Sequence, residues 1–196
     1  MLLSSLMAAY LNRLVDAEIA THLRTFGAVL LEGPRGVGKT TSGLRHSSSS
    51  IRLDADPGQL LLAKSSPETV LRGDVPRLID EWQLTPELWN VLRHELDRRS
   101  APGQFILTGS ATPSDESLRH SGAARILRLR MRPLTLFEMG ISSGQVSVNA
   151  LLAGEPLQPQ SALQPVSVSE FAALLTKGGW PNMRSLEPAE AQRLLR

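Results

Sequence analysis

The protein is a chain of 196 residues with 41% hydrophobic and 20% charged side chains, a composition typical of globular proteins that excludes collagen-like and strongly charged disordered classes. The absence of cysteine excludes disulfides, thiolate zinc sites and cysteine nucleophiles, and four scattered histidines leave little for another metal site. With 21 Lys and Arg against 19 Asp and Glu, the net charge of +2 does not predict that the chain as a whole binds nucleic acid.

The first predicted element is a helix over residues 10–23, where apolar residues recur at roughly helical spacing among charged ones. The apolar residues before it, 1–9, lack the basic region of a signal peptide and run directly into charged positions. No segment approaches the roughly 18 apolar residues that cross a bilayer. We therefore expect a cytoplasmic protein with no membrane partner.

Short apolar runs bounded by turn or helix signals predict the strands of a sheet. They cover residues 28–32, 51–54, 77–80, 104–108 and 125–130. Helical stretches lie between them, and the clearest of these begins around Thr85 and Pro86 and stops at Ser100. The serine run 47–50 is interpreted as a loop. Alternating strands and helices predict an α/β fold with a parallel sheet covered on both faces.

A glycine-rich segment directly after the first predicted strand matches the phosphate-binding consensus G-x-x-x-x-G-K-[ST]. It consists of Gly33, Pro34, Arg35, Gly36, Val37, Gly38, Lys39 and Thr40, with Thr41 next in the chain. Glycines allow positive φ and a close approach of backbone N–H groups to phosphate oxygens. We expect Lys39 to reach the β- and γ-phosphates, the Thr40 hydroxyl to bind Mg²⁺, and the helix that opens there to face the anion. The alternative is a chance match in a glycine-rich turn, which the flanking strand and helix signals disfavour.

Two adjacent carboxylates, Asp80 and Glu81, end the third predicted strand in a Walker B pattern. Because side chains alternate at a strand end, the two have different predicted tasks. Asp80 would hold Mg²⁺ through water, and Glu81 would orient and deprotonate the attacking water. An adjacent Glu favours hydrolysis over phosphotransfer. The alternative is a solvated Asp–Glu pair at the entrance of a helix.

The fourth predicted strand ends in hydroxyl residues, where a central strand would reach the γ-phosphate. Thr108 or Ser110 is a candidate to hold the water, with Ser110 preferred as the catalytic residue. An ordinary turn after a strand is the alternative interpretation.

The region between residues 119 and 132 contains five arginines and no acidic residue. By parity Arg128, Arg130 and Arg132 share one strand face, which we expect to be solvated. Arg125 precedes the strand, where it could complete the site of a neighbouring subunit as an arginine finger or form a structural ion pair. A basic groove for nucleic acid is a further interpretation, although no aromatic residue is interleaved for base stacking.

Composition changes after residue 141 and suggests three regions. Residues 1–141 form the predicted first domain, and 142–168, rich in Ser, Gln, Pro and Gly, form a linker. A short helix is predicted over 169–176, and a further helix begins at Pro188. Residues 169–196 are thus interpreted as the start of an incomplete helical C-terminal domain.

With these motifs in place, the sequence resembles the AAA+ branch of P-loop NTPases. It is similar in particular to a family of bacterial and archaeal AAA+-type ATPases in which a C-terminal domain of unknown function follows the ATPase domain. The resemblance spans residues 10–141 and rests on the segments 10–16, 26–30, 33–41, 105–110 and 130–138, and Gly178-Gly179-Trp180-Pro181 resembles the start of the C-terminal domain. The family's second half is largely missing, and no clear lid-domain arginine follows the fifth strand.

The resemblance implies a P-loop NTPase three-layer sandwich, a five-stranded sheet of order 5-1-4-3-2, ATP with Mg²⁺, and assembly into homo-oligomers. The leading hypothesis is a Mg²⁺-dependent ATPase that drives a conformational change in an attached C-terminal domain. The alternative is a nucleotide-dependent switch with negligible hydrolysis that recruits a protein or DNA partner. A small-molecule kinase is a third interpretation, weakened by the presence of Glu81.

Overall fold

The structure is a computed structural model that describes residues 10–109, 124–156 and 166–194. The chain divides into two compact units. One unit comprises Leu14–Arg132, and the other comprises Met1–Arg13 with Pro133–Arg196. Among the described residues, no helix combines the length and apolar character needed to span a bilayer.

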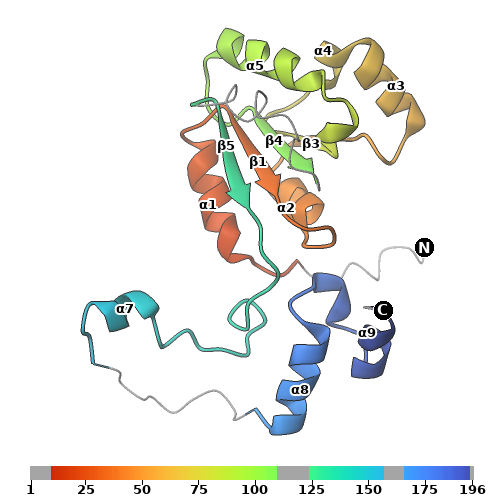
Figure 1. The fold of residues 1–196 in the computed structure, drawn as a ribbon. Helices are drawn as coiled ribbons and strands as arrows, with labels where there is room; N and C mark the ends of the chain where they lie inside the picture. The colour runs from red at the N-terminus through yellow and green to blue at the C-terminus, as the bar shows by residue number, and fades with distance from the viewer. Residues whose placement is uncertain (1–9, 110–123, 157–165, 195–196) are drawn as a thin grey trace, which may run out of the picture. The chain divides into compact units, whose positions relative to one another are not determined.

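The unit Leu14–Arg132 contains a five-stranded, all-parallel sheet of order β2-β3-β4-β1-β5. The strands are β1 (Ala28–Glu32), β2 (Ser49–Arg52), β3 (Arg77–Asp80), β4 (Phe105–Gly109) and β5 (Ile126–Arg130) (Figure 1). This arrangement confirms the expected α/β fold and the strand order 5-1-4-3-2. Since all strands run in the same direction, their carboxyl ends meet at one edge of the sheet.

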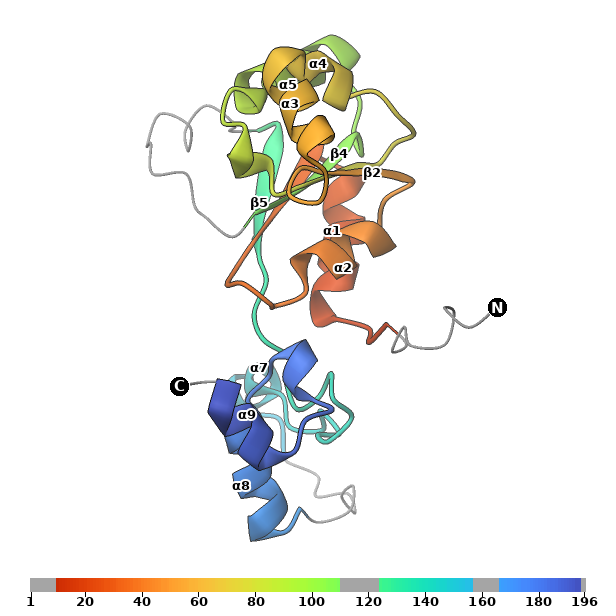
Figure 2. The same cartoon turned by 90° about the vertical axis from the view of Figure 1, so that its right-hand side faces the viewer.

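Helices cover both faces of this sheet, as expected for a three-layer sandwich (Figures 1 and 2). The helices of the unit are α1 (Leu14–Leu23), α2 (Lys39–Arg45), α3 (Pro57–Ser65), α4 (Pro67–Val70) and α5 (Leu88–Arg99). A Cβ atom added to Gly43 of α2 would lie 2.8 Å from the Leu78 side chain, so α2 packs closely on β3. Asp80 shares the parity of Leu78 along β3, which places the Asp80 side chain on the α2 face.

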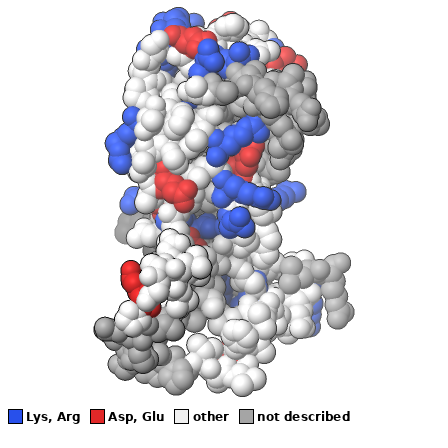
Figure 3. All heavy atoms as spheres, turned by 60° about the vertical axis from the view of Figure 1, so that its left-hand side comes forward, with Lys and Arg blue, Asp and Glu red and all other residues white. Residues whose placement is uncertain are grey.

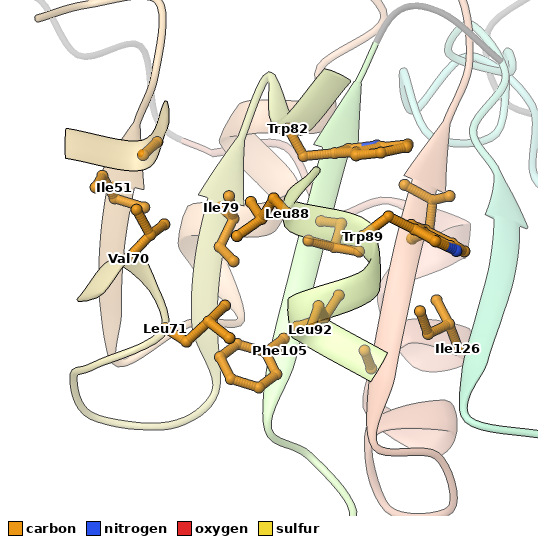
Figure 4. Close-up of a cluster of buried hydrophobic side chains, with 14 of the residues drawn as sticks. Ile51, Val70, Leu71, Ile79, Trp82, Leu88, Trp89, Leu92, Phe105 and Ile126 are labelled. Atoms are coloured by element: carbon orange, nitrogen blue, oxygen red, sulfur yellow. The ribbon is translucent and has the colours of Figure 1, made fainter. Parts of the chain in front are cut away.

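The main hydrophobic core lies between the sheet and α5, on the opposite face from α2 (Figure 4). Phe105 and Leu107 of β4 are buried against Leu88, Trp89 and Leu92 of α5. The rings of Trp82 and Trp89 have centroids 5.0 Å apart and are tilted by 36°. Aromatic pairs at this separation contribute beyond the area they bury, so the tryptophan pair helps to fix α5 on the sheet.

Two expectations about individual strands are corrected. The serine run was expected to form a loop, but Ser49 and Ser50 begin β2 because their backbones pair with Arg77 and Leu78 of β3. Arg128 was expected to face solvent. Instead its guanidinium lies 5.8 Å from the Trp89 ring centroid and 3.1 Å from Glu32 Oε1, because its face of β5 packs beneath α5.

In the unit that contains Pro133–Arg196, the regular secondary structure of the described residues is helical. Its elements are α7 (Val148–Leu152), α8 (Val168–Lys177), the short 3₁₀ helix η2 (Pro181–Met183) and α9 (Pro188–Leu194). Arg13 Nε lies 3.0 Å from Glu138 Oε1, and both side chains are almost fully buried. The Leu134 N–H donates to the Gly179 carbonyl at 2.7 Å. The helix α7 falls within the predicted linker, and the proposed domain boundaries stay a prediction.

Candidate functional site

The glycine-rich segment leads from the end of β1 to the first residue of α2 (Figure 1). Gly33, Gly36 and Gly38 have φ values of 150°, 79° and 100°. These conformations are accessible to glycine and strained for most other residues. A Cβ atom at Gly33 would also lie 2.6 Å from the Met131 carbonyl oxygen, whereas one at Gly36 would meet no atom within 4 Å. The segment therefore packs tightly at Gly33, against the residue that follows β5, and has open space around Gly36.

Lys39, the first residue of α2, folds back over the loop. Its side chain is buried, and Nζ donates hydrogen bonds to the carbonyls of Gly33 at 2.8 Å and Pro34 at 3.0 Å. Burial lowers the pKa of the Lys39 ammonium, while the negative charges of Glu81 and Asp80 act in the opposite direction. The lysine thus places a cation at the loop, close enough to both carboxylates for their negative charges to influence its pKa.

Asp80 at the end of β3 connects three elements. The Thr40 hydroxyl of α2 donates to Asp80 Oδ1 at 2.8 Å, and the Thr108 hydroxyl of β4 donates to the same oxygen. The other oxygen, Oδ2, lies 3.4 Å from Nε of Arg52 on β2. The strand register explains this convergence, because Asp80 pairs with Arg52 on one side and with Thr108 on the other.

Glu81 follows Asp80 in a left-handed backbone conformation, with φ of 56° and ψ of 43°. Such a conformation is uncommon for residues other than glycine and often marks a turn or a functional constraint. It leads into the 3₁₀ helix η1 (Trp82–Leu84). The Gln83 amide nitrogen Nε2 donates a hydrogen bond to Glu81 Oε2.

The other residues predicted for the site differ from one another in their contacts and in their exposure to solvent. Thr108 bonds to Asp80, while Ser110 lies outside the described residues. Pro34, Arg35 and Thr41 are exposed, and Val37 is fully buried beneath the loop.

Arg125 lies at the opposite end of β1 from the glycine-rich segment 33–41, which we call the phosphate loop. Its carbonyl accepts a hydrogen bond from the N–H of Ala28, the first residue of β1, and its guanidinium bonds to Asp97 of α5. The phosphate loop follows the other end of β1. With about 3.3 Å per residue, the strand separates Arg125 from the loop by ~16 Å. Arg125 therefore does not belong to the site of its own chain.

The basic residues around β5 are partly neutralised within the described structure. Arg125 is paired with Asp97, and Arg128 with Glu32. In the view that brings the left-hand side of Figure 1 forward, several basic side chains gather near the middle of the visible face, with an acidic side chain among them (Figure 3). Arg130 and Arg132 are exposed, as expected from their parity.

Sequence reasoning missed two residues of the site, Arg52 and Gln83. Arg52 belongs to the site because of the pairing of β2 with β3, which a single sequence does not reveal. Gln83 carries a local signal, since it lies two residues after Glu81 in a segment that has to turn sharply after the strand.

The oxygen donors of the site suit a magnesium ion. Mg²⁺ usually keeps several waters and is held by one or two carboxylates together with substrate phosphates. Thr40 and Asp80 already lie in direct contact. Among the described residues, no group of three His, Cys, Asp or Glu side chains forms a site made by protein ligands alone.

A family model described as "AAA domain" matches residues 25–140, a range that contains the phosphate loop, Asp80 and Glu81. The chain belongs to this family of AAA domains. The match confirms the expected AAA-type P-loop ATPase domain, a nucleotide-binding domain, while the expected C-terminal domain stays a prediction.

Two curated relatives of this AAA domain are 33% identical over 131 residues. They are the uncharacterized proteins Mb2031c of Mycobacterium bovis and Rv2008c of Mycobacterium tuberculosis. The aligned part covers 65% of this chain and 30% of each relative, so the chain spans about a third of their length. A solved structure, that of C. elegans PCH-2, aligns with a TM-score of 0.43 and 14% identity, over 92% of this chain and 59% of that one.

Proposed function

We propose that this AAA domain binds ATP together with Mg²⁺ and hydrolyses it, with Glu81 as the general base. The observation that carries the proposal is the convergence of Lys39, Thr40, Asp80 and Glu81 at the carboxyl edge of the sheet. Thr40 and Asp80 are in hydrogen-bond contact, and the charge of Glu81 acts on the buried Lys39. Residues distant in the sequence thus supply a cation, metal-ligating oxygens and a base around one loop.

Binding would involve an exchange of partners at Lys39. Its ammonium bonds to two carbonyls of the loop, and phosphate oxygens are stronger acceptors for a charged donor. The loop glycines have positive φ and no Cβ, which allows backbone N–H groups to approach phosphate oxygens closely. We propose residues 33–41 as the segment that holds the triphosphate.

The Thr40 hydroxyl and the Asp80 carboxylate are the proposed holders of Mg²⁺. When bound, Mg²⁺ would neutralise the charge of the phosphates. Thr108 supports this role by donating to the same Asp80 oxygen as Thr40, which fixes the orientation of the carboxylate.

Glu81 is the proposed base because it is the carboxylate beside Asp80 whose oxygens are not committed to Thr40 or Thr108. A positioned carboxylate that accepts the proton of an attacking water contributes about 10²- to 10⁴-fold to the rate. We further propose that hydrolysis drives a conformational change in the part of the protein that follows the AAA domain, and that the domain works in the cytoplasm. A catalytic role of Arg125 would require the site of a neighbouring copy.

The test is phosphate release from ATP with and without Mg²⁺, compared between the wild type and Glu81→Gln. We expect Glu81→Gln to bind Mg²⁺–ATP with an unchanged dissociation constant and to lose about 10²- to 10⁴-fold in kcat. The matched control is Glu87→Gln, the same change at an exposed carboxylate of the same unit. Undiminished turnover in Glu81→Gln would remove Glu81 from the mechanism.

The same experiment separates the switch hypothesis from hydrolysis. Wild-type phosphate release equal to that of Lys39→Ala, with ATP-dependent capture of a protein or DNA partner retained, would favour the switch. Transfer of labelled phosphate to a metabolite without release to water would favour a kinase.

A further inference from the structure

The side chain of Gln83 holds a defined position between Glu81 and the end of β4. Its amide nitrogen donates to Glu81 Oε2. Its carbonyl oxygen Oε1 is buried and has no hydrogen-bond partner among the described residues. Because an unpaired buried polar atom costs free energy, packing alone does not explain a glutamine here.

Gly109 at the end of β4 provides the space that Gln83 occupies. A Cβ atom at Gly109 would collide with Gln83 Oε1 and lie 3.2 Å from the indole nitrogen of Trp82. The φ of Gly109 is not in the left-handed range, so a larger residue there would displace the Gln83 side chain without straining the backbone. The Gln83 side chain therefore fills the space left by the missing side chain of Gly109.

The hydrogen bond restricts the Glu81 carboxylate. One carboxylate oxygen is tied to the amide, and the other is left to accept a further hydrogen bond. The left-handed backbone of Glu81 leads directly into η1, where Gln83 is near enough to bond to the Glu81 carboxylate. Without the amide, the carboxylate would regain rotamers that point away from the phosphate loop.

We propose that Gln83 is a positioning residue that keeps the Glu81 carboxylate facing the phosphate loop before and during hydrolysis. This inference rests on the proposed function of Glu81 as the base. Gln83 touches neither the loop nor the metal-holding residues in the described contacts, so it acts through Glu81. A base held in place before the reaction avoids reorganisation when the proton is transferred.

The test is Gln83→Met, which keeps the length of the side chain and removes the amide donor. We expect kcat to fall about 10- to 100-fold, the loss associated with a displacement of about 1 Å in a catalytic group. The dissociation constant of Mg²⁺–ATP should stay unchanged because Gln83 does not contact the loop. The thermal midpoint should not fall, because the substitution removes a buried oxygen that has no hydrogen-bond partner. Gln145→Met, the same change at an exposed position, is the matched control and should keep wild-type kcat.

A double-mutant cycle shows whether Gln83 acts through Glu81. In the Glu81→Gln background, Gln83→Met should have no further effect on kcat. Gly109→Ala is a second variant that displaces Gln83 without altering it, and it should lower kcat in the wild-type background without adding to the effect of Gln83→Met.

The outcomes distinguish a failure of the positioning role of Gln83 from a failure of the proposed ATPase function. Wild-type kcat in Gln83→Met, or an equal loss from Gln83→Met in both backgrounds, would overturn the positioning role while leaving the proposed function in place. A wild-type protein that releases no phosphate would overturn the proposed function and this inference together.

Discussion

The Thr40 hydroxyl donates a hydrogen bond of 2.8 Å to Asp80 Oδ1, joining the first turn of α2 to the end of β3. The contact forms because β3 lies beside β4 in the sheet and α2 packs across both strands. It brings the two predicted metal-holding residues together at the carboxyl ends of the strands. Single substitutions in this site have separable expected effects.

Lys39→Ala should abolish tight nucleotide binding. The variant loses the buried ammonium that lies within the field of Glu81 and Asp80 and would bind the phosphates. Hydrogen bonds to charged groups contribute ~1.5–3 kcal/mol, so the dissociation constant of Mg²⁺–ATP should rise about 10- to 100-fold. Calorimetric titration measures this change. Lys64→Ala, at an exposed lysine, serves as the control and should bind like the wild type.

Arg52→Gln should lower the Mg²⁺ concentration needed for half-maximal ATP binding. The Arg52 guanidinium lies 3.4 Å from Asp80 Oδ2 and competes with a metal ion for the same carboxylate. Asp80 is buried but Arg52 is about half exposed, so solvent screens their attraction to ~0.2–1 kcal/mol and the expected decrease is about two- to fivefold. A Mg²⁺ titration at fixed ATP measures it, with the exposed Arg72→Gln as control. An increased Mg²⁺ requirement would show instead that Arg52 assists the site.

Glu95→Gln should reduce thermal stability at neutral pH and lose this effect in acid. Hydrogen bonds from Arg98 and Arg99 lower the pKa of Glu95 from 4.5 to about 2. The ionised carboxylate therefore stabilises the folded state above about pH 4.5, and this contribution disappears as the pH falls toward 2.

After allowance for solvent screening, the thermal midpoint of Glu95→Gln should be on the order of 2–4 °C below that of the wild type at pH 7. The difference should shrink on acidification toward pH 2. Thermal unfolding of both proteins across this range is the measurement. A difference that grows toward acid would contradict the assignment.

Trp89→Ala should destabilise the unit Leu14–Arg132 by about 3–5 kcal/mol, the range for a buried aromatic residue replaced by alanine. Trp89 is buried between α5 and the sheet, contacts Trp82 and lies beneath the Arg128 guanidinium. Urea unfolding measures the free energy. Leu61→Ala removes an exposed side chain of α3 and should change it by less than about 0.5 kcal/mol.

The sequence predicts this fold well where an element is marked by a short run of neighbouring residues. Apolar runs locate β1 and β3 with the observed boundaries, and the phosphate loop and the Asp80–Glu81 pair are readable because each is a short contiguous pattern. The strand order was predicted from the family resemblance, because the sequence of a single strand does not indicate which strands pair with it. The start of β2 was misplaced by two residues because backbone pairing with β3, and not side-chain character, decides where a short serine-rich strand begins.

The contacts of the site were less predictable than its residues. Arg52 reaches Asp80 only through the register of two strands. Outside the site, Arg128 likewise stacks on Trp89, which belongs to a helix far away in the sequence. Such contacts depend on tertiary packing, which periodicity within one segment does not encode.

The position of Arg125 has a consequence for symmetry. This arginine lies beside the amino end of β1, and the phosphate loop follows the carboxyl end of the same strand. If Arg125 of one copy serves the loop of another, the two copies use opposite ends of the sheet and meet head to tail. Such heterologous contacts do not pair off into a two-fold dimer, and repetition of them generates a closed ring or an open filament.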